Sequence, residues 1–389
     1  MRILWLSDSP LTCTGYATIS WNILNRLAEQ GHECFYIGHN YVGQPIPKGL
    51  KLQDGTEFKF TLLGGSPQPY AQDLLMPYIK KYKPDVFGIL LDTFMTYPWL
   101  LNLDFSPAKT IFYYPSDGGG GMPLGCENIL KKVNCPVAMA RYGQRQVKAL
   151  YGMDTNYIPH AIDINNYYPL PEEEKLKLRQ KYGLQDKFVV GVVARNQGRK
   201  MLDRTIKSFA MFAKEHPNAI LFMHTDPRDM AAPFDIAQLI MRYKLQNRVR
   251  FTGMTFFNGF DYKQMNEVYN VMDCFLLTTS GEGFGIPIIE AMGCKLPVVA
   301  TDYTTTHELL IEDGECGIPV PISSELTGSW NVERAIMDDN KCVEALSKLY
   351  KDAELRKRLG ETGKEKVDKL YNWESVGKNW SDLMEELGK

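Results

Sequence analysis

The sequence lacks the cysteine patterns that hold zinc or staple a small secreted fold. Its 389 residues contain eight cysteines, but no C-x-x-C pair and no zinc-like grouping with the six histidines. A disulfide scaffold and a zinc ribbon are therefore disfavoured as protein classes. Scattered free thiols are typical of a reducing compartment, so we expect a cytoplasmic protein.

The chain also has little net charge and no long apolar run. Lys and Arg number 44 against 46 Asp and Glu, a formal net charge of −2. Such a chain has no general field for a polyanion, so nucleic acid is disfavoured as a bulk partner, although a local basic groove stays open. The apolar run at residues 1–6 is too short for a signal peptide or a membrane span, and peripheral membrane contact is left open.

What the chain does have is the alternation of an α/β protein. Short β-rich runs alternate with longer segments of helical period, which is typical of parallel sheets covered by helices on both faces. The first series of predicted strands is 2–6, 33–37, 86–91, 110–114 and 137–140. The second series is 188–194, 219–224, 249–252, 274–278 and 298–300.

The restart of this alternation predicts two domains. A chain of this length exceeds the usual single core, and the segment 163–172, with Pro169 and Pro171, has the composition of a linker. We therefore expect one domain over 1–165 and a second over 166–372. The remaining segment, 373–389, has helical period.

The clearest local signal is residues 280–293, SGEGFGIPIIEAMG, directly after a predicted strand. Pro287 suits the first helical position, so the amides near 284–286 would form a helix N-terminus that favours a phosphate. Ile286 stands where the dinucleotide fingerprint needs glycine, which disfavours a nicotinamide cofactor. Glu282 and Glu290 can accept hydrogen bonds from sugar hydroxyls; the alternative is that both are solvated charges.

A second glycine-containing loop lies within residues 192–200, whose sequence is VVARNQGRK. Arg195 at the end of a strand and Lys200 at the start of the next helix could grip both phosphates of a diphosphate leaving group. Arg199 is a third candidate. A solvated basic loop is the alternative.

These residues resemble the retaining glycosyltransferases of family four, which have the GT-B fold. The family's Glu-x7-Glu motif matches Glu282 and Glu290, and its arginine followed five residues later by lysine matches Arg195 and Lys200. Its amino-terminal glycine loop resembles 11–16, and its interdomain stretch resembles 157–163. The resemblance covers nearly the whole chain and implies two Rossmann-like domains facing across an interdomain cleft, with the helix at 373–389 packing back on the first domain.

The resemblance also implies a donor site drawn from both domains. The residues it assigns are Glu282 and the backbone of Phe284 and Gly285 for the sugar, Glu290 for the ribose, Arg195 with Lys200 for the diphosphate, Gly15 on the opposite domain, and Thr252 with Gly253 for the base.

The activity implied is transfer of a hexose or related sugar from a nucleoside-diphosphate sugar, UDP- or GDP-linked, to an acceptor hydroxyl with retention. No protein nucleophile, metal or cofactor is implied, because the departing phosphate takes the acceptor proton and the sugar nucleotide is a co-substrate. The acceptor stays open: glycan, lipid, small molecule, protein or modified nucleic acid. Alternatives are a catalytically silent nucleotide-sugar binding protein and a nucleotide-sugar epimerase on the same fold.

The sequence departs from the family pattern after the strand 110–114. Many members carry a histidine there, whereas this chain continues with Pro115, Ser116, Asp117 and a run of glycines at 118–121. Asp117 either replaces that histidine near the sugar or acceptor, or begins an Asp-Gly turn.

Overall fold

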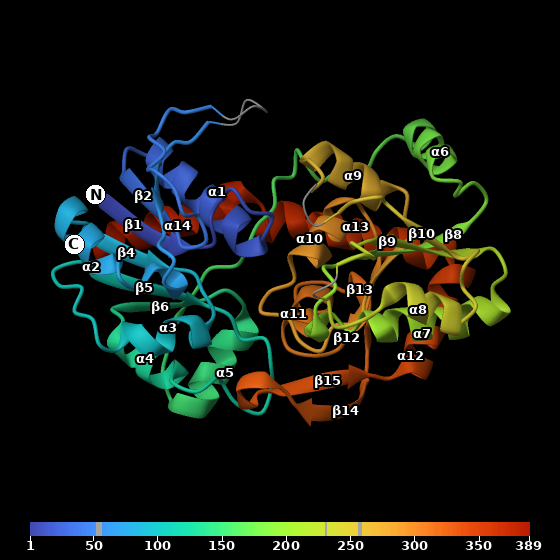
Figure 1. Cartoon of the computed structure of the whole chain (residues 1–389). Coiled ribbons are helices and arrows are strands. Elements are labelled where there is room, and N and C mark those ends of the chain that lie inside the picture. Colours follow the sequence, from blue (N-terminus) through green and yellow to red (C-terminus); the bar gives the residue numbers. More distant parts are fainter. Residues whose placement is uncertain (52–56, 230–231, 256–258) are drawn as a thin grey trace.

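Two parallel sheets form the centres of two α/β domains in the computed structural model, which describes residues 1–51, 57–229, 232–255 and 259–389 (Figure 1). The first sheet has the strand order β3-β2-β1-β4-β5-β6-β7 and the second the order β10-β9-β8-β11-β12-β13. The expected α/β architecture of two Rossmann-like domains is thereby confirmed.

The first sheet lies between helices on both faces. Its strands are β1 (Arg2–Ser7), β2 (Glu33–Gly38), β3 (Thr61–Gly64), β4 (Val86–Ile89), β5 (Lys109–Tyr114), β6 (Cys135–Ala138) and β7 (Asn156–Tyr157). Its helices are α1 (Gly15–Glu29), α2 (Leu75–Tyr82), α3 (Thr93–Leu100), α4 (Cys126–Lys132) and α5 (Arg141–Tyr151), with a 3₁₀ turn at Pro69–Ala71.

The second sheet begins at Phe188 and is covered in the same way. Its strands are β8 (Phe188–Val193), β9 (Ala219–His224), β10 (Val249–Phe251), β11 (Cys274–Leu277), β12 (Val298–Thr301) and β13 (Gly317–Val320). Its helices are α6 (Glu172–Lys181), α7 (Leu202–Glu215), α8 (Ile236–Arg242), α9 (Tyr262–Asn270), α10 (Ile286–Gly293), α11 (Thr305–Leu310), α12 (Asp339–Lys351) and α13 (Ala353–Leu370), with 3₁₀ turns at Gly198–Lys200 and Ser329–Asn331.

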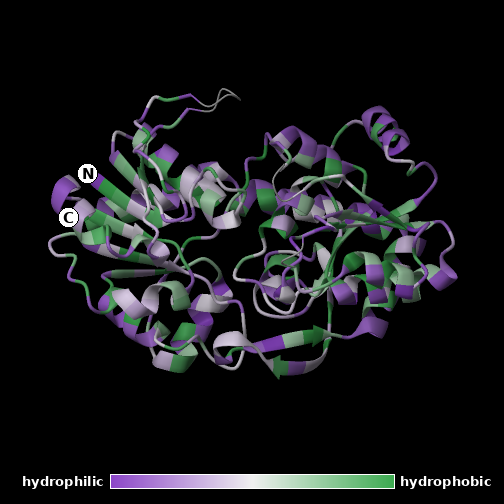
Figure 2. Cartoon of the chain, viewed as in Figure 1, coloured by the Kyte–Doolittle hydropathy of each residue, from purple (hydrophilic) through white to green (hydrophobic). Residues whose placement is uncertain are grey.

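The ten strands expected from the sequence are all present, with ends within two residues of the predicted ones. They are found because parallel strands are buried on both faces and so are nearly continuous apolar runs, which Figure 2 shows as hydrophobic strands beneath mainly hydrophilic helix surfaces. The sequence analysis missed the short strands β3, β7 and β13. It also missed an antiparallel hairpin, β14 (Ile322–Thr327) and β15 (Glu333–Met337).

The chain crosses between the domains twice. It leaves the first sheet after Tyr157 and returns near Tyr371, where the amide of Ile162 donates to the carbonyl of Tyr371 at 2.9 Å. The final helix, α14 (Trp373–Leu387), then lies against α1, and the ring of Trp380 packs edge-on to Trp5 and Tyr113 at centroid distances of 5.5 and 5.0 Å. The carboxyl-terminal helix is thus part of the first domain's packing.

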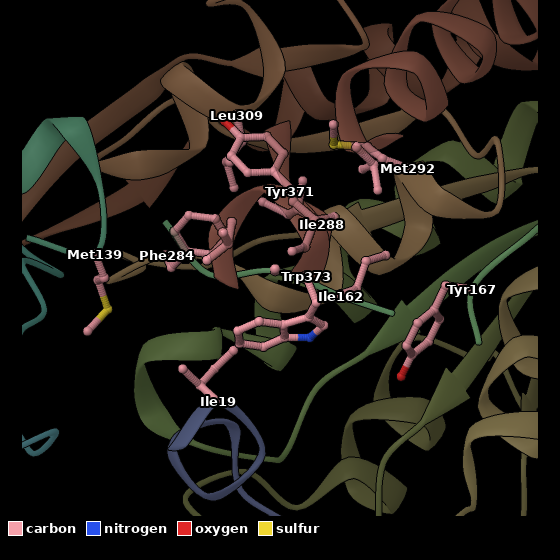
Figure 3. Close-up of a cluster of buried hydrophobic side chains, with 14 of the residues drawn as sticks. Ile19, Met139, Ile162, Tyr167, Phe284, Ile288, Met292, Leu309, Tyr371 and Trp373 are labelled. Atoms are coloured by element: carbon pink, nitrogen blue, oxygen red, sulfur yellow. The ribbon is translucent and has the colours of Figure 1, made fainter. Parts of the chain in front are cut away.

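Apolar and aromatic side chains fill the region of these crossings. Figure 3 shows Phe284, Ile288 and Tyr371 close together, with Trp373 and Ile162 beside them. The buried His160 joins this cluster: its ring lies 4.9 Å from that of Phe284, and its Nδ1 lies 2.8 Å from the hydroxyl of Tyr113. His160 therefore has a packing role in this cluster.

The burial of His160 predicts that the free energy of unfolding falls at acidic pH. Burial lowers its pKa from 6.5 to about 3, so between these values the unfolded chain binds a proton that the folded chain does not. Stability from this group is complete above pH 6.5 and falls as the pH drops toward 3. We expect His160→Gln to remove about 2 kcal/mol of the loss in unfolding free energy between pH 7 and pH 5, measured by urea titration. Equal pH slopes in the two proteins would contradict this.

Candidate active site

The two domains meet at the carboxyl ends of their strands, where the glycine loop at 280–285 touches the loop after β5. A Cβ atom at Gly281 would overlap the carbonyl oxygen of Asp117, and one at Gly283 would lie 2.9 Å from Cβ of Pro115. These two glycines therefore permit a close backbone contact between the domains. It brings the end of β11 against the end of β5.

Glu282 lies at the centre of this junction with two cations, a group we call the Glu282 cluster: Glu282, Lys200 and Arg199. Nζ of Lys200 donates to Oε1 of Glu282 at 2.7 Å, and Nη1 of Arg199 donates to Oε2 at 2.8 Å. The side chains of Glu282 and Lys200 are only 4% and 8% exposed. Glu282 is therefore a buried counter-ion, and the alternative of a solvated loop carboxylate does not hold.

The charges of the cluster stabilise one another. Burial opposes ionisation of Glu282, but Arg199 and Lys200 outweigh it and hold the pKa of the carboxyl at about 2. Burial and repulsion from Arg199 lower the pKa of Lys200 to about 8. The cluster carries one net positive charge when fully ionised, which is a suitable environment for an incoming anion.

Backbone contacts between neighbouring loops hold the cluster in place. Lys200 ends a 3₁₀ turn, and Met201 follows in a left-handed conformation with φ of 49°. The amide of Ser280 donates to the carbonyl of Arg199 at 2.7 Å, and the hydroxyl of Thr278 donates to the carbonyl of Met201 at 2.9 Å. Because β8 and β11 are adjacent, the two loops after them are brought to the same place.

Arg195, which the spacing paired with Lys200, lies in the same loop but outside the Glu282 cluster. Its side chain is half exposed and its Nε lies 3.8 Å from Oδ2 of Asp229. Thr252 and Gly253 follow the edge strand β10, two strands from β8. There the hydroxyl of Thr252 lies 3.0 Å from Nδ1 of His224. The predicted diphosphate and base residues therefore spread along one edge of the second sheet.

The amino-terminus of α10 faces the first domain. Gly285 caps this helix with φ of 107°, and the carbonyl of Phe284 accepts from the hydroxyl of Thr305 at 2.8 Å while its ring is buried in the crossing region. Gly15, expected in a loop, is instead the first residue of α1. A Cβ at Gly15 would lie 3.2 Å from Cδ1 of Ile286, so the amino-termini of α1 and α10 approach each other across the junction.

Glu290 lies deeper in α10 and faces α9. Its Oε2 accepts a hydrogen bond from the hydroxyl of Tyr269 at 2.6 Å. Burial raises the pKa of Glu290, although hydrogen bonds from Tyr269 and Tyr167 oppose the rise. The carboxylate of Glu290 is thus paired with α9, whereas that of Glu282 is paired with Lys200 and Arg199.

Glu290 gives a prediction for donor binding. If its carboxylate holds the ribose, Glu290→Gln weakens nucleoside-diphosphate binding about tenfold or more, since hydrogen bonds to a charged group contribute about 1.5–3 kcal/mol, and leaves kcat nearly unchanged. Isothermal titration with UDP and GDP measures this. Tyr269→Phe is the matched control, because it removes the observed partner and keeps the carboxylate. A normal Kd in folded Glu290→Gln would contradict the ribose assignment.

Asp117 is bound by an arginine from the other domain. Nη2 of Arg334 donates to Oδ1 of Asp117 at 3.1 Å, and Nη1 donates to its carbonyl oxygen. The following Gly119 pairs with Glu333 in an isolated antiparallel bridge. Asp117 thus lies at the junction, next to the glycine loop, and does more than begin a turn.

Sequence reasoning missed a second carboxylate on the first domain. Oδ1 of Asp92, the N-cap residue of α3 in the loop after β4, accepts from the hydroxyl of Tyr16 at 2.7 Å. Burial, with the charge of Asp117 adding to it, raises the pKa of Asp92 to about 6 despite the bond from Tyr16. An acidic residue following a buried strand was the available signal, but nothing in the sequence indicated its partner.

Two absences concern the part of the chain that the structure describes. No group of three or more His, Cys, Asp or Glu residues there is arranged to hold a metal ion. Among those same residues, every helix is too short or too polar to cross a bilayer.

The comparison with protein families identifies the class. Residues 174–366 match the model of the family "Glycosyl transferases group 1". The matched segment contains the Glu282 cluster, Arg195 and Glu290. This matched segment, about half of the chain, therefore belongs to the family.

Among curated proteins, the chain is similar to mannosylfructose-phosphate synthase of Agrobacterium fabrum, with 24% identity over 244 residues, 60% of this chain and 49% of the relative. It is also similar to a GDP-mannose-dependent monoacylated alpha-(1-6)-phosphatidylinositol monomannoside mannosyltransferase of Corynebacterium glutamicum, with 24% identity over 281 residues, 69% of this chain and 67% of the relative. The match spans about half to two thirds of the length of these relatives.

Solved structures share the fold over the whole chain. Sucrose-phosphate synthase from Thermosynechococcus elongatus superposes with a TM-score of 0.79 at 18% identity, covering 100% of this chain and 99% of that one. Anabaena HepE, solved in complex with UDP and glucose, superposes with a TM-score of 0.72 at 15% identity, covering 99% and 100%. The fold is GT-B, as the resemblance implied.

Proposed function

We propose that the chain transfers a hexose or related sugar from a nucleoside-diphosphate sugar to an acceptor hydroxyl, with retention at the anomeric carbon. The observation that carries the proposal is the Glu282 cluster, in which two cations lie at the junction of the domains beside the amino-terminus of α10. Departure of a nucleoside diphosphate concentrates negative charge on the leaving oxygen. Preorganised cations and helix amides are the groups that stabilise such charge.

In this proposal each residue has a defined part. Lys200, with Arg199 or Arg195, neutralises the diphosphate, and the amides at the start of α10 add donors. Glu282 orients the two cations and accepts from a hydroxyl of the donor sugar. No side chain is assigned as nucleophile, because the departing phosphate oxygen can take the acceptor proton on the same face of the sugar.

The donor and the acceptor are proposed as classes. One relative is named as GDP-mannose-dependent, and one solved neighbour is described with UDP and glucose. These names support a UDP- or GDP-sugar as donor. Asp117, Asp92 and Tyr16 give the first domain polar groups at the junction, which suits recognition of an acceptor hydroxyl.

A screen of UDP-, GDP- and ADP-sugars by thermal shift and slow hydrolysis tests the proposal. We expect one sugar nucleotide to raise the melting temperature and to be hydrolysed, because a ligand that binds only the folded state stabilises it. Stabilisation with neither hydrolysis nor transfer to any acceptor would favour the silent binding protein. Conversion to an epimeric sugar nucleotide would favour the epimerase, and a flat screen would contradict all three.

The proposed charge neutralisation by side chains predicts a metal-independent reaction. We expect EDTA to change the hydrolysis rate of the preferred donor by less than about twofold, since Lys200 and Arg199 do the work that a divalent ion does elsewhere. Rates are compared with and without added Mg²⁺ or Mn²⁺. A complete loss restored by either ion would overturn this part of the proposal.

A further inference from the structure

The β14–β15 hairpin extends from the second domain and pairs with the first. Glu333 and Gly119 exchange both backbone hydrogen bonds at 3.0 Å, and the ring of Trp330 stacks on Phe94 with a centroid distance of 4.8 Å and an interplanar angle of 6°. Figure 1 shows the hairpin along one side of the junction between the two domains. The hairpin is therefore a direct link between the domains, separate from the two chain crossings.

The glycines after Asp117 make room for this link. A Cβ at Gly118 would lie 2.9 Å from the carbonyl oxygen of Glu333, and one at Gly119 would overlap the hydroxyl of Tyr303. A side chain at Gly118 would push the hairpin away, and one at Gly119 would displace Tyr303 of the second domain. The glycine run, for which an Asp-Gly turn was one of the two interpretations of the sequence, is fitted to a partner from the other domain.

Arg334 is the residue of the hairpin that contacts a candidate active-site group. Its guanidinium holds both the carboxylate and the carbonyl of Asp117, and its side chain is 16% exposed. A planar fork of donors fixes direction as well as distance, which a lysine cannot do.

The same strand is bonded to the donor side of the junction. The amide of Ala335 donates to the carbonyl of Ser280 at 3.0 Å, and the amide of Ser280 donates to the carbonyl of Arg199 at 2.7 Å. β15 thus connects Asp117 of the first domain with the Glu282 cluster of the second through three consecutive hydrogen-bonded steps.

Charge decides what Arg334 contributes. Asp117 interacts electrostatically with Arg199 and Lys200, and Arg199 also holds Glu282. Without Arg334, Asp117 keeps its electrostatic interactions with Arg199 and Lys200, and a direct pair with Arg199 would compete with the bond from Arg199 to Glu282. Arg334 pairs with Asp117, so Arg199 remains paired with Glu282.

We propose that Arg334 is a positioning residue for sugar transfer: it fixes Asp117 beside the glycine loop and thereby keeps the Glu282 cluster intact. The catalytic part of this inference rests on the proposed function. The structural part, in which Arg334 holds the loop at 115–121 in place, is independent of the proposed function.

Four variants test the catalytic part: Arg334→Gln, Arg334→Lys, Asp117→Asn and the double variant R334Q/D117N. We expect Arg334→Gln to lower kcat about tenfold or more, with the Kd for UDP or GDP changed by less than about twofold. Arg334→Lys keeps the charge and should recover part of the rate. Because Arg334 acts through Asp117, the double variant should be no slower than Asp117→Asn, whereas multiplied losses would overturn the proposal.

Trp330→Ala is the matched control on the same hairpin. It removes the stack on Phe94 but keeps Arg334, so kcat should stay within about twofold of the parent. A loss equal to that of Arg334→Gln would show that the hairpin acts as a whole and that Arg334 has no positioning role of its own.

Hydrogen exchange provides a readout that needs no donor. We expect amides at 116–121 to exchange faster in Arg334→Gln than in the parent, and more so than in Trp330→Ala, because the direct hold on the loop is lost. Unchanged exchange there overturns the proposal even if the enzyme is active. Should no sugar nucleotide be bound or hydrolysed by the parent, the proposed function fails while this measurement still decides what Arg334 holds.

Discussion

Lys200→Met is expected to lower the rate of sugar transfer by about 10²–10³-fold. Nζ of Lys200 lies 2.7 Å from Glu282 in a site that is almost closed to water, where a fixed cation stabilises a departing diphosphate most strongly. Methionine fills the buried space of the lysine stem, and Glu282 keeps its bond to Arg199, so the fold should persist. The measurement is single-turnover hydrolysis of the preferred donor.

Matched variants show which arginine acts with Lys200 on the departing diphosphate. Lys207→Met removes a lysine that pairs with Asp339 away from the junction, and its rate should match the parent. Arg195→Met and Arg199→Met separate the two arginines: the family spacing assigns the role to Arg195, whereas the observed contacts assign it to Arg199. A normal rate for Lys200→Met would contradict the leaving-group assignment itself.

Glu282→Gln is expected to cost about 3–5 kcal/mol of unfolding free energy as well as the activity. The substitution leaves Lys200 and Arg199 close together without their shared counter-ion, and uncompensated buried charge is among the most costly single changes. Urea unfolding at pH 7 measures the loss.

The double variant E282Q/K200M tests whether the loss of stability comes from the unpaired cations. It removes one of the two stranded cations, so it should be more stable than Glu282→Gln alone, even though it carries one more substitution. A nucleoside diphosphate should also stabilise Glu282→Gln more than it stabilises the parent, because it supplies the missing negative charge. Strictly additive losses would contradict the coupling of the three side chains.

The strands of both sheets could be predicted because burial on two faces leaves a continuous apolar run, as at Phe188–Val193. The β14–β15 hairpin could not be predicted in this way. β14 is largely exposed, and β15 buries only Ala335 and Met337, so neither strand has the composition of a core element. Its partners are distant in the sequence: Ser280 of its own domain and, about two hundred positions earlier in the chain, Gly119 and Phe94 of the first domain.

The candidate site was predicted in part. The two motif spacings, one with Glu282 and the other with Lys200, led to two residues that are in contact, because they follow adjacent parallel strands. Arg199 was only a third candidate, since its part depends on the 3₁₀ turn and the left-handed Met201, which bring Arg199 and Lys200 to the same carboxylate. The contact of Asp92 with Tyr16 and that of Asp117 with Arg334 depend on how domains and loops pack, which no local pattern encodes.

The return of α14 to α1 makes the second domain an insertion within the first. Residues 1–157 supply the first sheet, but Trp5 and Tyr113 are covered by Trp380 from the far end of the chain. A fragment that stops at the first crossing would leave this aromatic surface bare, whereas joining residue 162 to 372, which already pair, would keep it covered. The natural place to divide this protein is therefore a pair of cuts through the two neighbouring crossings, because a single cut in the linker separates the first domain from its own last helix.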